Sequence, residues 1–217
     1  MLSSKYVVRS AKERADDMTT TTERLTVVTP ANRVPGPGQG NWTYDDYAAL
    51  PDDGQRYEIV DGVLYMAPSP SGSHQDVVGW LFHYLLTHVR IAGLGRVYIA
   101  PFDIELAPGQ VVQPDVTVVL NANCEKIKPS RIIGAPDLVV EVSSPSTVGF
   151  DRRQKQDAYA RSGVTEYWIA DPIAQTIEVF FLVGGAYQSQ GIFIGNTTLV
   201  SQVVPTISEI RVEKFFV

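Results

Sequence analysis

The segment Asp137–Ser144 constrains the fold more than any other part of this chain. Its sequence, DLVVEVSS, is almost entirely apolar from Leu138 to Val142. A run of this kind is typical of a central strand that is buried on both faces, and such a strand must be covered by other elements. We therefore expect a sheet that is flanked by helices.

The other periodic segments supply the strands and helices of such a domain. Asp61-Gly62 separates two β-rich runs and is the strongest short signal for a hairpin. Apolar residues then recur at helical spacing, and Ser73 precedes them as a candidate cap. In chain order we expect strands at 56–60 and 63–67, a helix at 75–90, strands at 96–106, 111–120 and 137–144, a helix at 150–163, and a hairpin at 166–171 and 176–183. This order predicts an α/β domain in which a mixed sheet is flanked by helices.

Composition places the chain among ordinary soluble proteins. It has 217 residues, of which 44% are hydrophobic, and that length suits one domain. Cys124 is the single cysteine, so an internal disulfide framework is excluded. No apolar run approaches the roughly 20 residues that span a bilayer, and the N-terminus does not resemble a secretory signal. We therefore expect a cytoplasmic protein with no membrane partner.

Charge and composition differ between the start of the chain and the rest. Residues 1–40 are rich in Thr, Pro and Gly and show no sustained period, so we expect a flexible leader. Residues 41–217 form the predicted domain, whose first helix Thr43 can cap. This domain carries 12 basic and 20 acidic residues, a net charge of −8. An acidic body argues against a protein that coats nucleic acid without specificity.

Two carboxylates lie inside apolar strands: Asp115 in VVQPDVTVV and Glu141 in LVVEVSS. A buried charge is costly unless it is paired, hydrogen-bonded or bound to a metal. One interpretation is that each residue marks a strand end and reaches solvent. If the two strands pair, however, their backbones lie about 4.8 Å apart and the carboxylates can share a cation. Oxygen ligands of this kind suit Mg²⁺ or Mn²⁺, and the Val142 carbonyl could add a third.

A helix with a suitably spaced lysine follows these strands. Asp151, Lys155 and Tyr159 occur at i, i+4 and i+8, which places them on one helix face. That face could be solvated, with a weak Asp–Lys pair. Alternatively, Lys155 leans over the bound cation and stabilises the negative charge that develops on a phosphoryl group.

These segments together resemble a known family. They are Pro114-Asp115, the run Glu141-Val142-Ser143-Ser144-Pro145-Ser146, then Asp151, Lys155 and Tyr159, and finally GVTEYWIAD. The series resembles the Uma-two family of restriction endonucleases, which belongs to the PD-(D/E)xK nuclease superfamily. The upstream segment YEIVDGVLYMAPSPSGSH is similar to the opening of the same family, so the resemblance covers about Trp42 to Leu182.

The resemblance implies a restriction-endonuclease-like fold and magnesium-dependent phosphodiester hydrolysis. Asp115 and Glu141 would be the metal ligands. Ser143 stands where the superfamily usually has a lysine, two residues after the acid, and the family resemblance implies that Lys155 supplies the amine instead. Glu58 resembles the additional acid that superfamily members bring from an upstream element. Alternatively, Glu58 is a hairpin residue that forms an ion pair with a cationic side chain across the strand.

Several weaker candidates surround this set. His74 lies at a helix start, where a histidine could contact phosphate or transfer a proton, or have no role. Gln113 could orient a water molecule. A local basic cluster could contact DNA; it consists of Arg152, Arg153, Lys155 and Arg161. We interpret the remaining candidates as packing or surface residues: His83, His88, Tyr159 and Trp168.

Three functions remain in competition. The first is a magnesium-dependent (or manganese-dependent) endonuclease that hydrolyses DNA and works as a homodimer. The second is a binding or assembly module that keeps the nuclease fold without turnover, which the acidic body favours. The third treats Asp115 and Glu141 as the acid–base pair of a glycosidase, but no aromatic sugar platform lies near them.

Overall fold

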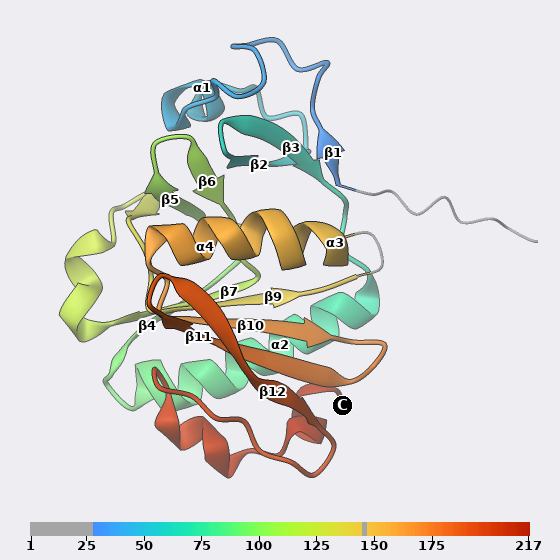
Figure 1. Cartoon of the computed structure of the whole chain (residues 1–217), viewed down its shortest axis with the longest axis vertical. Coiled ribbons are helices and arrows are strands. Elements are labelled where there is room, and N and C mark those ends of the chain that lie inside the picture. Colours follow the sequence, from blue (N-terminus) through green and yellow to red (C-terminus); the bar gives the residue numbers. More distant parts are fainter. Residues whose placement is uncertain (1–27, 145–146) are drawn as a thin grey trace, which may run out of the picture.

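The structure is a computed structural model that describes residues 28–144 and 147–217. Its strands form two mixed sheets of six strands each (Figure 1). In spatial order the first sheet contains β1 (Thr29–Pro30), β3 (Val63–Ala67), β2 (Arg56–Val60), β6 (Gln110–Val112), β5 (Asp103–Ala107) and β8 (Arg131–Ile133). The second contains β12 (Ala186–Ile194), β11 (Thr176–Val183), β10 (Glu166–Asp171), β9 (Leu138–Val142), β7 (Val116–Leu120) and β4 (Gly95–Ile99). The predicted α/β class is confirmed, with two sheets in place of one.

Two prolines explain why the strands form two sheets rather than the single sheet that was predicted. The run 96–106 divides into β4 and β5 around Pro101, and the run 111–120 divides into β6 and β7 around Pro114. Proline has no N–H for a strand ladder, so each strand ends there. The chain then crosses between sheets, because β4 pairs with β7 in the second sheet and β5 pairs with β6 in the first. The prediction of one continuous strand over each run is therefore wrong.

Helices cover both faces of the second sheet. In chain order the helical segments, with η for 3-10 and π turns, are α1 (Tyr44–Ala48), α2 (Gly72–Leu85), η1 (Leu86–Ile91), η2 (Asn121–Lys126), α3 (Val148–Phe150), η3 (Asp151–Lys155), α4 (Gln156–Ser162), η4 (Pro205–Glu209) and η5 (Val212–Phe215). The segments α3, η3 and α4 form one continuous helix that ends at Gly163, whose φ of +88° suits glycine. Figure 1 shows α4 between the two sheets and α2 behind the second sheet.

Nothing among the described helices combines the length and the apolar character that crossing a bilayer requires.

Strand β9 lies in the middle of the second sheet, parallel to β10 and antiparallel to β7. All five of its residues are buried, as predicted for the central strand. Leu138 and Val140 pack in the cluster that contains α2, whereas Val139 packs in the cluster that contains α4. Since side chains alternate along a strand, Glu141 shares the face of Val139 and points toward the α3–α4 helix.

The caps determine where the first two helices begin. Thr43 caps α1 as predicted, since its side chain accepts a hydrogen bond from the N–H of Asp46. Helix α2, however, is capped by Ser71, whose hydroxyl accepts the His74 N–H at 3.3 Å. The predicted cap, Ser73, lies within the first turn of the helix instead. This earlier start brings His74 into the first turn of α2.

Residues 28–40 contact the β2–β3 hairpin. Strand β1 pairs with β3, and the Gly40 N–H donates to the Gly62 carbonyl at 2.7 Å. The Gln39 side chain accepts the Leu64 N–H at 2.8 Å. Residues 1–27 of the predicted leader lie outside the described residues, so the division of the chain at residue 40 stays a prediction.

Candidate active site

A cavity of about 310 Å³ lies where the two sheets and the α3–α4 helix meet. Segments far apart in the sequence supply its ionisable and amide side chains: Arg56, Glu58, His74, Gln113, Asp115, Glu141, Asp151 and Lys155. All of these except Arg56 and His74 are buried. The structure therefore brings together the residues predicted for catalysis and metal binding, and the backbone of Val142 borders the same cavity.

Glu141 is held by two donors from the helix. Its Oε1 atom accepts a hydrogen bond from Lys155 Nζ at 2.9 Å and another from the Tyr159 hydroxyl at 2.6 Å. Glu141 is 4% exposed, so these bonds compensate for the water that the carboxylate has lost. Both hydrogen bonds end on Oε1, and Oε2 of Glu141 makes no hydrogen bond to a described residue.

Lys155 connects the two sheets. Its Nζ lies 2.9 Å from Glu58 Oε1 in the first sheet and 2.9 Å from Glu141 Oε1 in the second. Asp151, Lys155 and Tyr159 share one helix face, as their spacing predicts, and all three are buried rather than solvated. Glu58 therefore pairs with a cation from the helix and not across its own hairpin.

Pro114 determines where Asp115 points. In the β7–β9 pairing Val116 lies opposite Val140, and extending this register puts Pro114 opposite Val142. Because proline has no N–H, the ladder stops there. The Val142 N–H donates instead to Asp115 Oδ2 at 2.8 Å. The N–H and C=O of a strand residue point the same way, so the Val142 carbonyl is directed to the Asp115 side of β9.

Three carboxyl groups act on the ammonium group of Lys155, those of Glu58, Glu141 and Asp151, and Asp115 lines the same cavity. Burial raises the pKa of Glu141 well above its usual value, although Lys155 opposes this shift. Burial also raises the pKa of Asp151, to about 6. Burial alone would lower the pKa of Lys155, but the carboxylates outweigh it and the pKa is raised. The site therefore keeps its ammonium group, and burial together with the surplus of carboxyl groups makes Glu141 and Asp151 hold protons more tightly than usual.

The donor set suits a hard divalent cation that is held by few side chains. No group of three or more His, Cys, Asp or Glu side chains in residues 28–144 and 147–217 is arranged to hold a metal ion. Asp115 Oδ1 and Glu141 Oε2, however, make no hydrogen bonds to the described residues. Mg²⁺ is commonly held by one or two carboxylates and retains several waters. The residues fit a site of that kind.

His74 contacts one of the predicted metal ligands. Its Nε2 lies 3.1 Å from Asp115 Oδ2. Its Nδ1 is buried and has no hydrogen-bond partner in the described part of the chain. The Ser71 cap fixes the backbone of His74, so the ring approaches Asp115 from the start of α2.

Gln113 supports Glu58 through its backbone, because its N–H donates to Glu58 Oε1 at 2.7 Å. Its side-chain amide donates to the Tyr47 hydroxyl at 3.0 Å and to Asp103 at 2.8 Å. This use of the amide gives no support to the predicted role of orienting water. Sequence reasoning missed Tyr47 and Asp103, since no local pattern marks a contact between residues 56 positions apart.

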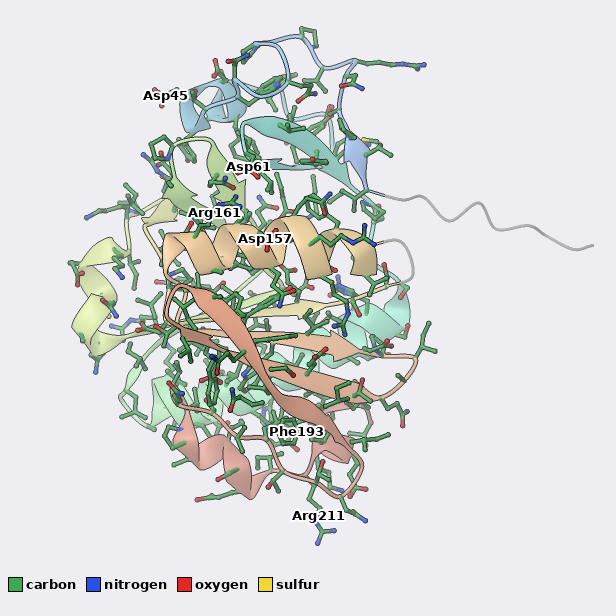
Figure 2. All side chains as sticks on the ribbon, viewed as in Figure 1. Asp45, Asp61, Asp157, Arg161, Phe193 and Arg211 are labelled. Carbon is green, nitrogen blue, oxygen red and sulfur yellow. The ribbon has the colours of Figure 1, made fainter. Side chains whose placement is uncertain are left out.

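The predicted basic cluster is partly neutralised by ion pairs. Arg152 lies 2.6 Å from a carboxylate of β11, and Arg161 lies 2.6 Å from Asp61. Figure 2 shows Arg161 on α4 below Asp61 of the β2–β3 turn. Arg153 is exposed, and neither it nor Arg152 lines the cavity.

A different arginine, Arg56, lines the cavity. The sequence did not predict it, because a lone arginine at the start of a strand belongs to no recognisable motif.

Comparison with known families covers most of the chain. The family model described as "Uma2: Putative restriction endonuclease" matches residues 44–213. The chain belongs to the Uma2 family. This confirms the resemblance that the sequence motifs indicate and extends it beyond Leu182. No curated protein matches the chain.

A solved structure shares the fold of this Uma2 chain. It is the crystal structure of a protein described as "a putative nuclease belonging to DUF820" from Anabaena variabilis ATCC 29413. The TM-score is 0.66 at 20% sequence identity, and the match covers 81% of this chain and 97% of that chain. At 20% sequence identity, the similarity between the two proteins shows a shared fold and nothing more. It confirms the predicted restriction-endonuclease-like architecture.

The amine at the site of this Uma2 chain comes from the helix. Ser143, which stands in place of the superfamily's usual lysine, is buried. Its N–H and its hydroxyl both donate to the Ala170 carbonyl, at 2.8 and 3.3 Å. Lys155 reaches Glu141 from the α3–α4 helix, which faces the strands as the sequence interpretation requires.

Proposed function

We propose that the protein is a magnesium-dependent endonuclease that hydrolyses DNA phosphodiester bonds. The observation that carries this proposal is the Lys155 ammonium group, which lies 2.9 Å from both Glu58 and Glu141 in the cavity that Asp115 also lines. Carboxylates beside an ammonium group can bind a hard cation and stabilise charge on a phosphoryl group. Uma2 membership and the nuclease-like fold support this reaction class. A cytoplasmic location belongs to the same proposal.

Each side chain at the cavity would have its own role in this reaction. Asp115, Glu141 and the Val142 carbonyl would hold Mg²⁺ or Mn²⁺. When bound, the ion supplies a positioned and acidified water and neutralises phosphate charge. Lys155 offsets the negative charge that develops on the pentavalent phosphorus, and Glu58 keeps the ammonium group at the cavity.

In this proposal the protein contacts DNA only through residues near the cavity. A body charge of −8 does not favour attraction of DNA over the whole surface. Arg56 lines the cavity, and Arg152 and Arg153 belong to the same continuous helix as Lys155. We propose that these arginines contact phosphates next to the scissile bond, and that His74 contacts the scissile phosphate.

Calorimetric titration with MgCl₂ or MnCl₂ tests the metal site. We expect the wild-type protein to bind the ion and Asp115→Asn to bind it about 10-fold or more weakly, because a neutral amide is a poor ligand for a hard cation. Asp137→Asn is the matched control. Asp137 is also buried, but it accepts hydrogen bonds from the Leu120 N–H and Asn123 and does not line the cavity. Its variant should bind the metal like the wild type.

Plasmid cleavage in the presence of Mg²⁺ tests turnover. The proposal expects nicked and linear DNA that depends on added metal and on Asp115. A protein that binds no metal through Asp115 and leaves plasmid intact would contradict it. That result would favour the alternative, a binding or assembly module that keeps the nuclease fold without turnover.

We further propose that the protein works as a homodimer that pairs through β12. This strand is outermost in the second sheet among the described residues, and the chain has no charged residue from Val179 to Ser208. Ile192 and Ile194 on it are 62% and 54% exposed. Natural sheet edges are usually guarded by charges or proline. An uncharged edge can instead pair with its own copy without the repulsion that a net charge of −6 otherwise causes.

Light scattering after size-exclusion chromatography tests the dimer. We expect the wild type to elute as a dimer and the double variant Ile192→Lys, Ile194→Lys to elute as a monomer, because each lysine puts like charges at the edge. Ile173→Lys is the control, since Ile173 is 77% exposed but lies between β10 and β11. A monomeric wild type, or a double variant that remains dimeric, would exclude this interface.

A further inference from the structure

Tyr159 has a polar group at the centre of the molecule that the proposed chemistry does not use. The side chain is fully buried, and its ring packs 5.2 Å from the ring of Tyr167. Packing explains why an aromatic ring occupies this position. It does not explain the hydroxyl, because a buried O–H is costly unless it finds a partner.

The partner is the carboxylate of Glu141. The Tyr159 hydroxyl donates to Oε1 at 2.6 Å, and Lys155 Nζ donates to the same atom at 2.9 Å. The last torsion of a glutamate side chain is broad, so an unrestrained carboxylate can rotate and exchange its two oxygens. Two donors on one oxygen restrict this rotation and leave the other oxygen, Oε2, without a hydrogen bond to any described residue.

Tyr159 is the more rigid of the two donors. Lys155 has a flexible four-carbon stem, and Glu58 competes for its ammonium group at 2.9 Å. The ring of Tyr159 is enclosed by the cluster that also contains Ala158, Val139 and Ile169, so its hydroxyl is a fixed point. Lys155 and Tyr159 are also four positions apart on one helix face. When that helix packs on the sheet, both donors therefore reach Glu141 together.

We propose that Tyr159 is a positioning residue that fixes the Glu141 carboxylate and presents its Oε2 atom to the divalent cation. This inference rests on the proposed function, because it concerns the same metal site. Hydrogen-bond partners of metal ligands typically change metal affinity or activity by about 10- to 100-fold when they are removed. The hydroxyl of Tyr159, rather than its ring, should therefore control metal affinity.

Tyr167 offers a matched control. It is also fully buried and packs in the same cluster, but its hydroxyl donates to the backbone carbonyl of Asp151 at 3.2 Å. Both Tyr159→Phe and Tyr167→Phe delete one buried hydroxyl and keep the ring. A merely structural hydroxyl would make the two variants alike. Thermal unfolding of each should show one cooperative transition with a lowered midpoint.

Calorimetric titration of the full chain with MnCl₂ separates the two roles. We expect the dissociation constant to rise about 10-fold or more in Tyr159→Phe and to stay within about twofold of the wild-type value in Tyr167→Phe. At saturating Mn²⁺ the cleavage rate of Tyr159→Phe should return to near the wild-type rate, because Asp115, Glu141 and Lys155 remain.

Two outcomes would overturn the inference: equal dissociation constants in the two variants, or a Tyr159→Phe rate that stays low at saturating metal while its affinity is unchanged. Failure of the proposed function has a different signature. In that case the wild type would bind no Mn²⁺ that depends on Asp115, whatever residue stands at position 159.

Discussion

Replacing Glu141 by Gln or Asp115 by Asn is expected to lower the rate of DNA cleavage by about 1000-fold or more, which corresponds to about 4 kcal/mol of activation free energy. Under the proposed function, each change removes a charged oxygen ligand of the metal ion but preserves the shape of the side chain. The new amide oxygen can still accept the hydrogen bonds from Lys155 and Tyr159, or from the Val142 N–H. Single-turnover cleavage of a labelled duplex with Mg²⁺ measures the effect.

The stability of these variants provides the control. Because like charges are removed from a cavity with excess carboxylates, the midpoint of thermal unfolding should stay at or above the wild-type value. Asp137→Asn should show the reverse pattern, with a lowered midpoint and a retained rate, because Asp137 only accepts structural hydrogen bonds. A Glu141→Gln variant that cleaves at the wild-type rate would remove Glu141 from the active site.

Replacing Lys155 by Met should lower both the cleavage rate and the stability of the fold, and should raise the affinity for Mg²⁺. Cleavage should fall by about 100- to 1000-fold, because the variant loses the ammonium group that we propose to stabilise the developing charge. Without metal, the fold should lose about 3 to 5 kcal/mol, since Glu58 and Glu141 would keep buried charges without their shared partner. Mg²⁺ should bind more tightly than in the wild type, because the variant no longer places a positive charge beside the ion.

Urea unfolding in EDTA and in Mg²⁺ measures this compensation. We expect most of the stability loss to appear in EDTA and less of it in saturating Mg²⁺. In EDTA the loss should also be larger at pH 8 than at pH 5. Burial already raises the pKa of Glu141, so the folded variant binds a proton there more tightly than the unfolded chain does. That proton stabilises the fold at low pH, and its contribution disappears as the pH rises through the raised pKa.

Lys126→Met is the control for Lys155→Met. Lys126 is partly buried and donates to the Ala135 carbonyl at 2.8 Å, away from the cavity. Its variant should be less destabilised, and Mg²⁺ should not alter the difference from wild type. If Mg²⁺ leaves the stability loss of Lys155→Met unchanged as well, the ion does not bind beside Glu141.

Local chemistry made the central elements predictable. The apolar run at 138–142 predicted a buried strand, and Asp61-Gly62 predicted a tight turn, in which both residues indeed have positive φ. The family motifs then made Asp115, Glu141 and Lys155 candidates for one site. Alternation along β9 explains why Glu141 lies at the same cavity as Lys155, because the acid follows Val139 by two residues and faces the helix.

Contacts between distant segments could not be predicted in this way. The prolines at 101 and 114 were visible, but the sequence does not say which sheet a chain enters after a break. Tyr159 was interpreted as a core aromatic, which describes its ring, yet the partner of its hydroxyl depends on how the helix docks. The bonds among Tyr47, Asp103 and Gln113 likewise exist only after the first sheet has formed.

The ammonium group shared by the two sheets also has a consequence for protein synthesis. A ribosome releases Glu58 first, then Asp115 and Glu141, and only afterwards Lys155 and Tyr159. Strand β10, which pairs with β9, follows later still. A nascent chain therefore carries the carboxylates before it carries the cation that brings them together. Under the nuclease proposal, a translation product that stops before Lys155 would lack the ammonium group of the site.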